Sequence, residues 1–342
     1  MYSSYESVLE YLPDTVKPIR DDDYTSQHPL FKVMESFCDE QKRSKFIVSL
    51  SGGVDSMVIL SVLHYLKCNV VALHINYNNR EESLEEQRFI EEWCSFNKIP
   101  IYIESIDHVK RGTINRNNYE TITRNIRFDF YKKIMEIENG DNIILGHHQD
   151  DIVENIFTNM MRARCVMDLC VMKESSVISE VPILRPILSL NKENVFSFAY
   201  SNNIPFFKDT TPSWSVRGKY RNQIYPMIQD TFGDNVKKNL LCVNNQMDEW
   251  SELINTTVVQ PFMDTCSFHK EFVGFPLKSK YPLTFWKYVF MKIFFQYRYN
   301  CPSQKGIQTF LQSIQTRESG NIPLSKNCIC SLDNNYITIY FI

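Results

Sequence analysis

The polar loop Ser51-Gly52-Gly53-Val54-Asp55-Ser56 has residue types suited to binding an anion. It follows the apolar run 46–50, which predicts a buried strand. It precedes 57–66, where apolar residues at helical spacing predict a helix. Glycines let the backbone bend and approach a ligand closely, and free N–H groups at a helix start point toward an anion. Two serine hydroxyls add donors, whereas Asp55 would repel a bare phosphate. The loop therefore predicts a phosphate site in which a divalent cation mediates between Asp55 and the anion.

This loop is not a Walker A motif, because no Gly-Lys-Ser/Thr follows its glycines. It resembles instead the PP-loop of ATP pyrophosphatases, which split ATP into AMP and pyrophosphate while adenylating a substrate. The alternative is an ordinary strand–turn–helix corner, where glycine pairs are common. The remaining polar segments decide between the two.

A second polar segment, residues 146–155, directly follows the apolar run 142–145. If a helix begins near Gln149, Asp151 and Glu154 are i, i+3 neighbours on one face. Carboxylates and imidazoles at the end of a strand could bind a cation, accept protons or hold an amine. Capping aspartates and packing histidines are the alternative. Capping and packing need fewer polar residues than this segment contains. It carries two histidines, two adjacent acids and a third acid, in the order His147-His148-Gln149-Asp150-Asp151-Ile152-Val153-Glu154.

A third candidate is the predicted helix 120–138. Arg124, Arg127 and Tyr131 are expected on the face opposite an apolar stripe formed by residues 122, 126, 130, 134 and 137. The two arginines are explained equally well by a helix face exposed to solvent and by a binding site for an anion. The net charge of −3 argues against non-specific coating of nucleic acid, while basic clusters at 110–133 and 217–221 favour a local polyanion site.

The elements that must position these segments alternate along the chain. Strands are predicted at 46–50, 69–75, 101–103 and 142–145, and helices at 83–97, 120–138, 149–162 and 190–202. Apolar strands alternating with helices indicate an α/β fold, a parallel sheet with helices on both faces. Ligands in such folds bind beyond the carboxyl ends of the strands. Segments 51–56, 74–80 and 146–154 all follow strands at that edge, so we expect them to converge.

The remainder of the chain predicts further parts. Residues 1–44 are expected to be irregular, and three domains are predicted: 1–228, a helical connector at 229–256, and a small α+β module at 257–342. The module is expected to contain helices at 281–298 and 306–315 and a terminal strand at 336–340.

Composition excludes several classes of protein. The chain has 43% hydrophobic and 23% charged residues, and its apolar runs are too short for a membrane span. Its N-terminus lacks the pattern of a signal peptide, so a cytoplasmic location is expected. Ten cysteines are present without Cys-x-x-Cys spacing. We therefore expect reduced thiols and neither structural zinc nor an iron–sulfur cluster.

Taken in order, the motifs resemble the tRNA(Ile)-lysidine synthetase family, within the PP-loop (adenine nucleotide alpha hydrolase-like) ATPases. The resemblance covers about 45–228, and more weakly 302–342, which is similar to that family's substrate-binding module. The series is Ser51-Gly52-Gly53-x-Asp55-Ser56, His74-x-Asn76, Arg80-Glu81-Glu82-Ser83, Glu120 with Arg124-x-x-Arg127-Phe128, His147-His148-x-Asp150-Asp151-x-x-Glu154, Arg185-Pro186-Ile187-Leu188, Asp209 and Arg221-Asn222-x-Ile224.

The resemblance implies a ligase that adenylates O2 of the wobble cytidine of an isoleucine tRNA, then replaces AMP with the ε-amino group of free lysine. It implies that 1–228 is the ATP-binding catalytic domain and 257–342 the tRNA-binding module. It also implies that Asp55 contacts Mg²⁺, that Arg124 and Arg127 neutralise phosphate or developing charge, and that Asp151 and Glu154 position the lysine amine. ATP would be bound by Ser51, Gly52, Gly53, Val54, Asp55, Ser56 and His74, and substrate or RNA by His148, Arg185, Arg217, Arg221 and Asn222.

The chain departs from that family at several positions. Asn155 replaces a usual Thr, Gln223 and Tyr225 replace usual arginines, and Asp209-Thr210-Thr211-Pro212 replaces the commoner Asp-x-Ser/Thr-Asn. The chain also ends earlier than long bacterial members. Two alternatives therefore stay open: a tRNA 2-thiolation type of PP-loop enzyme, although those carry Cys-x-x-Cys pairs, and a non-catalytic RNA-binding protein that retains the fold.

Overall fold

The computed structural model describes residues 5–13, 19–20, 22–42, 45–107, 109, 115–169, 172–277, 281–316, 320–333 and 335–342. The chain divides into two compact units. The first contains Met1–Thr158 and Val171–Leu241, and the second contains Asn159–Cys170 and Cys242–Ile342. None of the helices in these described ranges is long and apolar enough to cross a membrane.

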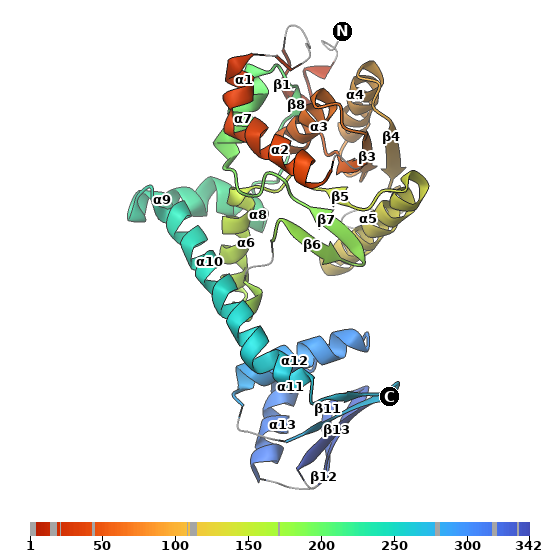
Figure 1. Cartoon of the computed structure of the whole chain (residues 1–342), viewed down its shortest axis with the longest axis vertical. Helices are drawn as coiled ribbons and strands as arrows, with labels where there is room; N and C mark the ends of the chain where they lie inside the picture. The colour runs from red at the N-terminus through yellow and green to blue at the C-terminus, as the bar shows by residue number, and fades with distance from the viewer. Residues whose placement is uncertain are drawn as a thin grey trace. The chain divides into compact units, whose positions relative to one another are not determined.

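A six-stranded sheet forms the centre of the first unit (Figure 1). Its strand order is β4-β3-β2-β5-β7-β6. Neighbouring strands from β4 to β7 are parallel, and this confirms the predicted α/β fold. The strands are β2 (Phe46–Ser49), β3 (Val70–Asn76), β4 (Ile101–Ser105), β5 (Ile143–Ile144), β6 (Ser175–Ile178) and β7 (Val181–Leu184).

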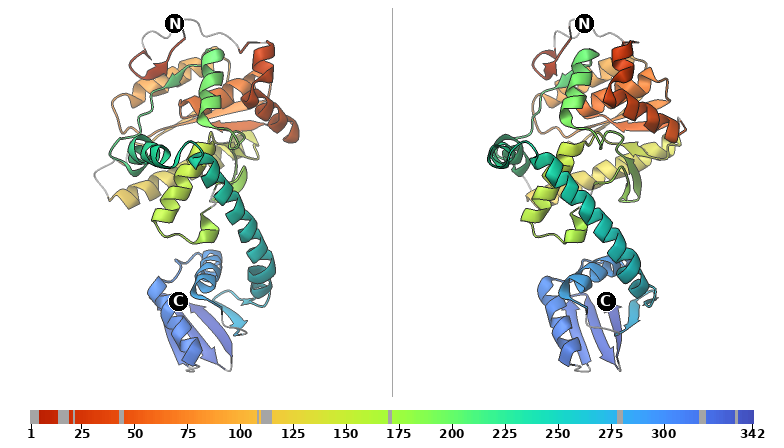
Figure 2. Two further views of the ribbon diagram at one scale, coloured as in Figure 1. Left: turned by 90° about the vertical axis from the view of Figure 1, so that its left-hand side faces the viewer. Right: turned by 60° about the vertical axis from the view of Figure 1, so that its left-hand side comes forward.

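Helices cover both faces of this sheet because its strands are apolar on both sides (Figures 1 and 2). Phe46 and Val48 pack into one core, whereas Ile47 between them packs into the other. The first core is built with α2 (Pro29–Glu40), α3 (Val54–Tyr65), α4 (Ser83–Phe96) and α7 (Lys192–Ser201). The second core is built with α5 (Arg116–Glu138), and α6 (Gln149–Met161) follows β5 directly.

The sheet is not wholly parallel, because β6 pairs with β7 in the antiparallel sense. The two strands are joined by Ser179 and Glu180, whose φ angles are 50° and 67°. Two successive residues with positive φ form the tight hairpin turn that matches strand twist. This hairpin lay outside the predicted elements, since β6 is half exposed and lacks an apolar run.

The prediction that 1–44 is irregular is wrong. The segment contains β1 (Leu9–Tyr11), which pairs with β8 (Phe206–Phe207), and also α1 (Asp23–Gln27) and α2. His28 caps α2 by accepting a hydrogen bond from the N–H of Leu30, and Pro29 occupies the first turn. Leu30, Met34 and Cys38 are buried at a spacing of four, which is the helical signal that the prediction missed.

The predicted stripe on α5 is also partly wrong. Ile122 and Ile137 are exposed, whereas Tyr131, expected beside the arginines, is buried and its hydroxyl hydrogen-bonds Ser49 at 2.7 Å. Tyr131 and Ile134 pack beside Phe130 against the sheet. The middle turns of this long helix pack against the sheet and are buried. Ile122 and Ile137, nearer its two ends, do not reach the sheet core and stay exposed. The helix also begins at Arg116, four residues before the predicted start.

Two π-helical segments each precede a proline. η3 (Tyr220–Ile224) joins α8 (Val216–Lys219) to α9 (Tyr225–Phe232), where Pro226 lies in the first turn. η4 (Asn255–Val259) joins α10 (Val236–Ile254) to α11 (Gln260–Met263), which contains Pro261. Proline has no N–H to donate to the preceding turn, and π segments are frequent at functional sites.

The second unit is a small α+β body. Its sheet has the order β11-β12-β13-β10-β9, and the buried residues of two helices pack against it around Trp286. The predicted helices 281–298 and 306–315 correspond to α12 (Leu283–Gln296) and α13 (Gln304–Thr316). The strands are β9 (Ser267–Phe268), β10 (Phe272–Pro276), β11 (Gly320–Ser325), β12 (Cys328–Asp333) and β13 (Tyr336–Phe341). This unit also contains the short helix η2 (Val166–Asp168).

Candidate functional site

The glycine loop leads from the carboxyl end of β2 to the start of α3. Gly52 has φ of +80°, and its carbonyl accepts a hydrogen bond from the N–H of Phe207 at 2.9 Å. Ser56 Oγ donates to the Gly53 carbonyl at 3.0 Å and accepts from the N–H of Ser51 at 3.2 Å. Gly53, the N-cap of α3, supplies no side-chain hydrogen bond. The first N–H groups of α3 are therefore left for a ligand.

Gly52→Ala is expected to destabilise the first unit by about 2–5 kcal/mol. An added Cβ would combine a left-handed backbone with a position 2.0 Å from Cε2 of Phe207. Gly233→Ala is the matched control, since Gly233 has φ of +83° and no heavy atom within 4 Å of the added Cβ. Its expected loss is only the backbone strain of about 1–2 kcal/mol. Chemical denaturation measures both, and equal losses would contradict the role of the Phe207 ring.

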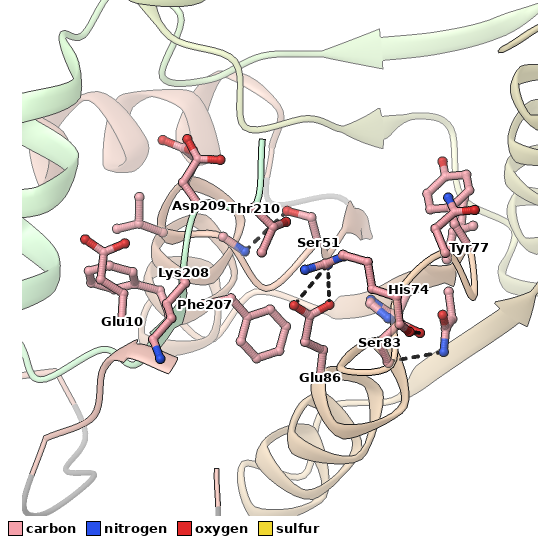
Figure 3. A pocket seen from close by; sticks show the side chains of 18 of the residues that line it. Glu10, Ser51, His74, Tyr77, Ser83, Glu86, Phe207, Lys208, Asp209 and Thr210 are labelled. Carbon is pink, nitrogen blue, oxygen red and sulfur yellow. Dashed lines mark hydrogen bonds and ion pairs between the residues drawn. The ribbon is translucent and has the colours of Figure 1, made fainter. Parts of the chain in front are cut away.

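A cavity of about 410 Å³ opens beside this loop (Figure 3). The Nδ1 of buried His74 lies 2.9 Å from the Leu50 carbonyl, and burial lowers the pKa of its imidazole. Arg80 donates to both carboxylate oxygens of Glu86 at 3.0 and 2.8 Å. The loop residues that line the cavity are Ser51, Gly53, Val54 and Asp55. Other lining residues come from the end of β3 and the segment that follows it (74–80), from the start of α4, and from 206–210.

Asp55 forms an ion pair with a lysine from a distant helix. Lys192, the first residue of α7, places Nζ 2.8 and 2.7 Å from the two carboxylate oxygens of Asp55. Asn191 caps this helix by accepting from the N–H of Asn194. Gly146 lies so near that an added Cβ would be 2.8 Å from Cβ of Asp55. The glycine loop and the segment after β5 therefore meet at Asp55.

Buried His148 connects these two segments. Its Nε2 lies 3.6 Å from Asp55 Oδ1 and 3.4 Å from Asp151 Oδ2, and its backbone N–H donates to Asp151 Oδ2 at 3.1 Å. Its Nδ1 lies 3.4 Å from Asp150 Oδ2 and has no hydrogen-bond partner within the described ranges. An imidazole that lies within 3.6 Å of three carboxylates can hold their relative positions.

Asp151 and Glu154 lie on one face of α6, and two arginines clamp them. Arg217 from α8 contacts Asp151 Oδ1, and its Nε lies 2.8 Å from Glu154 Oε1. Arg221 from η3 lies 3.1 Å from Asp151 and donates from Nε to Glu154 at 2.9 Å. Burial alone would raise the pKa of Asp151, but His148 and Arg217 hold it below its usual value. Asp151 is therefore ionised at neutral pH.

Asp150 faces a different cation. Lys237, at the start of α10, places Nζ 2.7 Å from Asp150 Oδ1, and the backbone N–H of Lys192 donates to Oδ2 at 3.1 Å. Although burial alone would raise the pKa of Asp150, His148 and Lys237 keep it well below its usual range. This carboxylate is thus fixed and ionised beside the histidine.

A second cavity, of about 280 Å³, adjoins the first. Four residues line both cavities: Lys192, Phe196, Asp209 and Arg221. The second cavity is also lined by His148, Asp150, Val153, Glu154, Tyr220 and Tyr225. It combines carboxylates with aromatic rings, and Tyr225 lies where the resembling family has an arginine.

Other predicted site residues line neither cavity. Arg127 donates from Nε to the hydroxyl of Tyr77, which lines the first cavity, at 3.0 Å. Arg124 is exposed, and its guanidinium lies 5.1 Å above the ring of Phe128. Asn222 is exposed as well. The first residues of the basic cluster, 110–114 with Lys110 and Arg111, lie outside the described residues.

Arg185 is buried and serves the site indirectly. Its Nε donates to Nδ1 of His147 at 3.0 Å, and its Nη1 donates to the Lys173 carbonyl and the Ser176 hydroxyl. Burial lowers the pKa of Arg185, and it lowers the pKa of His147 to about 4. His147 is therefore neutral at pH 7, and Arg185 fixes the orientation of its ring. The structure places the Arg185 side chain as a support of β6 and His147.

Sequence reasoning missed Lys192, Lys237 and the aromatic residues Phe196 and Tyr220. One signal for Lys192 was available: Asn191 is a good N-cap at the start of the predicted helix, and it places Lys192 at the same edge of the sheet. No local pattern marks Lys237, because its partner Asp150 is far away in the sequence.

Together, the parallel sheet, the glycine loop at its carboxyl edge and the uncapped helix start define an α/β protein of the nucleotide-binding kind. The sequence matches the family model of the PP-loop domain over residues 26–228, more than half of the chain. The chain therefore belongs to the PP-loop domain family, and the predicted membership is confirmed.

Several curated relatives carry the name that the motif series predicts. The tRNA(Ile)-lysidine synthase of Oceanobacillus iheyensis is 31% identical over 54% of this chain and 41% of its own length. That of Chlamydia felis is 27% identical over 67% of this chain and 71% of its own length. The bifunctional protein TilS/HprT of Listeria monocytogenes is 29% identical over 54% of this chain. The match spans 30% of that relative and 41% of the Oceanobacillus one, so it covers less than half of either.

Among solved structures, the U34-tRNA thiolase NcsA of Methanococcus maripaludis, which holds a [4Fe-4S] cluster, has a similar fold. The TM-score is 0.51 at 16% sequence identity, covering 72% of this chain and 88% of NcsA. At this identity the likeness shows the fold alone.

Proposed function

We propose that this protein is a ligase that uses ATP to join free lysine to the wobble cytidine of an isoleucine tRNA, forming lysidine. One observation carries the proposal: the first cavity, at the glycine loop, adjoins the second cavity, which is lined by acidic and aromatic residues. The two cavities share Lys192, Phe196, Asp209 and Arg221. The names of the relatives support the same reaction.

The first cavity suits ATP. The start of α3 and the Ser51 hydroxyl present donors to phosphate, and the buried, neutral His74 and the Arg80–Glu86 pair offer polar groups farther along the cavity. In this proposal the α-phosphate is directed toward the second cavity, where the cytidine O2 attacks it and pyrophosphate leaves with the electron pair of the broken P–O bond.

The residues fit a magnesium ion shared with the nucleotide. Magnesium prefers oxygen ligands and often takes one or two carboxylates together with substrate phosphates. Asp55 supplies such a carboxylate in the first cavity. In the part of the chain that the structure describes, no group of three or more His, Cys, Asp or Glu side chains is placed to hold a metal. Bound Mg²⁺ would supply charge neutralisation on the leaving pyrophosphate.

The second cavity suits the nucleophile and the base. An adenylated cytidine needs an amine, whereas water would only restore cytidine, so the site must favour an ammonium and exclude water. The Glu154 and Asp150 carboxylates line this cavity and attract a cation. Tyr220 and Tyr225, whose rings are 5.9 Å apart, provide aromatic surface on which a base can stack.

We assign Arg124, Arg127 and Asn222 to the polyanion side, as the resemblance implies, and the 257–342 module to tRNA contact. Arg127 is the best placed of the three, because it donates to the hydroxyl of Tyr77, which lines the first cavity. The proposed cytoplasmic location follows from these partners.

Mass spectrometry of nucleosides tests the proposal. Incubation of the protein with tRNA, ATP and lysine should give a cytidine derivative carrying a lysine residue, together with AMP and pyrophosphate. Reactions without lysine, and with ornithine in its place, are the controls. A product that carries sulfur, or no modified nucleoside with cognate tRNA, would refute lysidine formation.

Metal analysis separates this proposal from the thiolation alternative. We expect no stoichiometric iron or zinc in anaerobically purified protein, because no group of three or more His, Cys, Asp or Glu side chains in the described ranges is placed to hold a metal. The buried thiols of Cys38 and Cys68, with sulfurs 3.7 Å apart, lie within the first core. Stoichiometric iron with sulfur transfer to tRNA would move the assignment to thiolation. The non-catalytic alternative predicts that tRNA binds without any ATP–pyrophosphate exchange.

A further inference from the structure

Lys192 occupies a position that the motif series does not explain. Both carboxylate oxygens of Asp55 are within 2.8 Å of its ammonium, and the two side chains are 26% and 22% exposed. The ammonium also lies 5.2 Å above the Phe196 ring. Lys192 lines the first and the second cavity alike. Lys192 thus places a cation, carried on a flexible side chain, where the first and second cavities adjoin.

The Asp55–Lys192 pair cannot stay unchanged when a nucleotide arrives. If both oxygens of Asp55 remain tied to the ammonium, the carboxylate is a weak ligand for a metal that accompanies phosphate. A nucleotide also brings several negative charges within reach of Lys192, whose flexible four-carbon stem can follow them. The glycine loop itself contains no lysine, unlike a Walker A loop.

We propose that Lys192 is a further catalytic residue, which exchanges Asp55 for the α-phosphate of the bound nucleotide. The proposal rests on the function proposed above. The ammonium of Lys192 supplies charge where the bond from phosphorus to cytidine O2 forms and the bond to pyrophosphate breaks. Before nucleotide binds, the same ammonium neutralises Asp55, so the carboxylate is shielded until nucleotide enters.

A purely structural ion pair gives a different result. Lys45 and Glu138 form such a pair outside both cavities, with side chains 27% and 15% exposed, so Lys45→Met removes a lysine of matched exposure. Lys192→Arg retains the charge and tests whether a cation alone suffices. Circular dichroism of each variant establishes that it is folded.

Two binding measurements carry the test. Lys192→Met should bind Mn²⁺ alone more tightly, because Asp55 loses its competing cation, with paramagnetic resonance of free Mn²⁺ as the readout. The same variant should bind MgATP more weakly, by about 10- to 100-fold, since a charge-assisted hydrogen bond to phosphate is lost. Lys192→Arg should recover most of the MgATP affinity, and Lys45→Met should match the wild type in both measurements.

The outcomes separate this proposal from the proposed function. Unchanged MgATP affinity in Lys192→Met, or parallel loss of Mn²⁺ and MgATP binding, would overturn the role of Lys192. If the opposed changes appear but no lysine-bearing nucleoside forms with wild-type protein, the lysidine assignment fails while the role of Lys192 stands.

Discussion

Asp55→Asn is expected to lower ATP consumption by about 10²–10³-fold, which corresponds to roughly 3–4 kcal/mol of lost transition-state stabilisation. The amide keeps the size of the side chain but removes the charge that would contact Mg²⁺ on the leaving pyrophosphate. Asp55 is the carboxylate of the glycine loop and lines the first cavity. Turnover is measured as release of AMP and pyrophosphate in the presence of tRNA.

The control for this variant is Glu138→Gln. Glu138 also forms an ion pair with a lysine and is similarly shielded, but it lies outside both cavities. It should leave turnover within about twofold of wild type, since partly exposed ion pairs contribute about 0–1 kcal/mol. ADP as the main product, or full turnover by the Asp55→Asn protein, would contradict the PP-loop mechanism.

The central sheet could be predicted from the sequence because its strands are continuous apolar runs. Strands are the natural interpretation of three such runs between predicted helices: 46–50, 69–75 and 142–145. The ends of each run differ by about one residue from those of the observed strand. The glycine loop was predictable for the same reason, since a strand, two glycines and a helix fix its local geometry.

Strand β1 and the β6–β7 hairpin could not be predicted in this way, whereas α2 carried a helical spacing that could have been recognised. β1 pairs with β8 across almost two hundred residues, so its existence depends on the packed fold rather than on its own three residues. Short, half-exposed strands such as β6 give no periodic signal. Their sequences carry little information without the neighbours that pair with them.

Within the site, residue types were predictable but pairings were not. The i, i+3 spacing placed Asp151 and Glu154 on one face of a helix, as the structure shows. Their arginine partners come from α8 and η3, more than sixty residues away. Likewise, nothing local indicates that Lys192 reaches Asp55. Such contacts depend on how helices pack on the sheet, and they decide which carboxylates are free to hold a substrate.

This pairing bears on how lysine would be held. The ε-amine of free lysine has a pKa of about 10.4, so at pH 7 almost all of it is ammonium. Both Asp151 and Glu154 are already in contact with Arg217 and Arg221. Glu154 lines the second cavity, whereas Asp151 is buried behind it with a lowered pKa. We therefore expect Glu154 to contact the ammonium and Asp151 to fix the two arginines around it.

Glu154→Gln is accordingly expected to retain partial adenylation of tRNA while losing lysine transfer by about 10²-fold or more, the scale of a positioned acid–base group. Asp151→Asn should also lose transfer, with a smaller change in the KM for lysine, because it acts through Arg217 and Arg221. Adenylation is measured by ATP–pyrophosphate exchange. Lysine transfer is measured by formation of the lysine-bearing nucleoside. Glu180→Gln, an exposed acid paired with Lys132, is the control and should change neither.

The pH dependence sharpens this test. The neutral fraction of the lysine amine rises about tenfold per pH unit below its pKa. A variant that fails because the ammonium is poorly held and poorly deprotonated should therefore recover part of its transfer rate between pH 7 and pH 9, and it should recover more than the wild type gains. If adenylated tRNA reacts with lysine equally well in Glu154→Gln and wild type, or if neither variant separates adenylation from transfer, the second cavity is not the lysine site and only the PP-loop assignment remains.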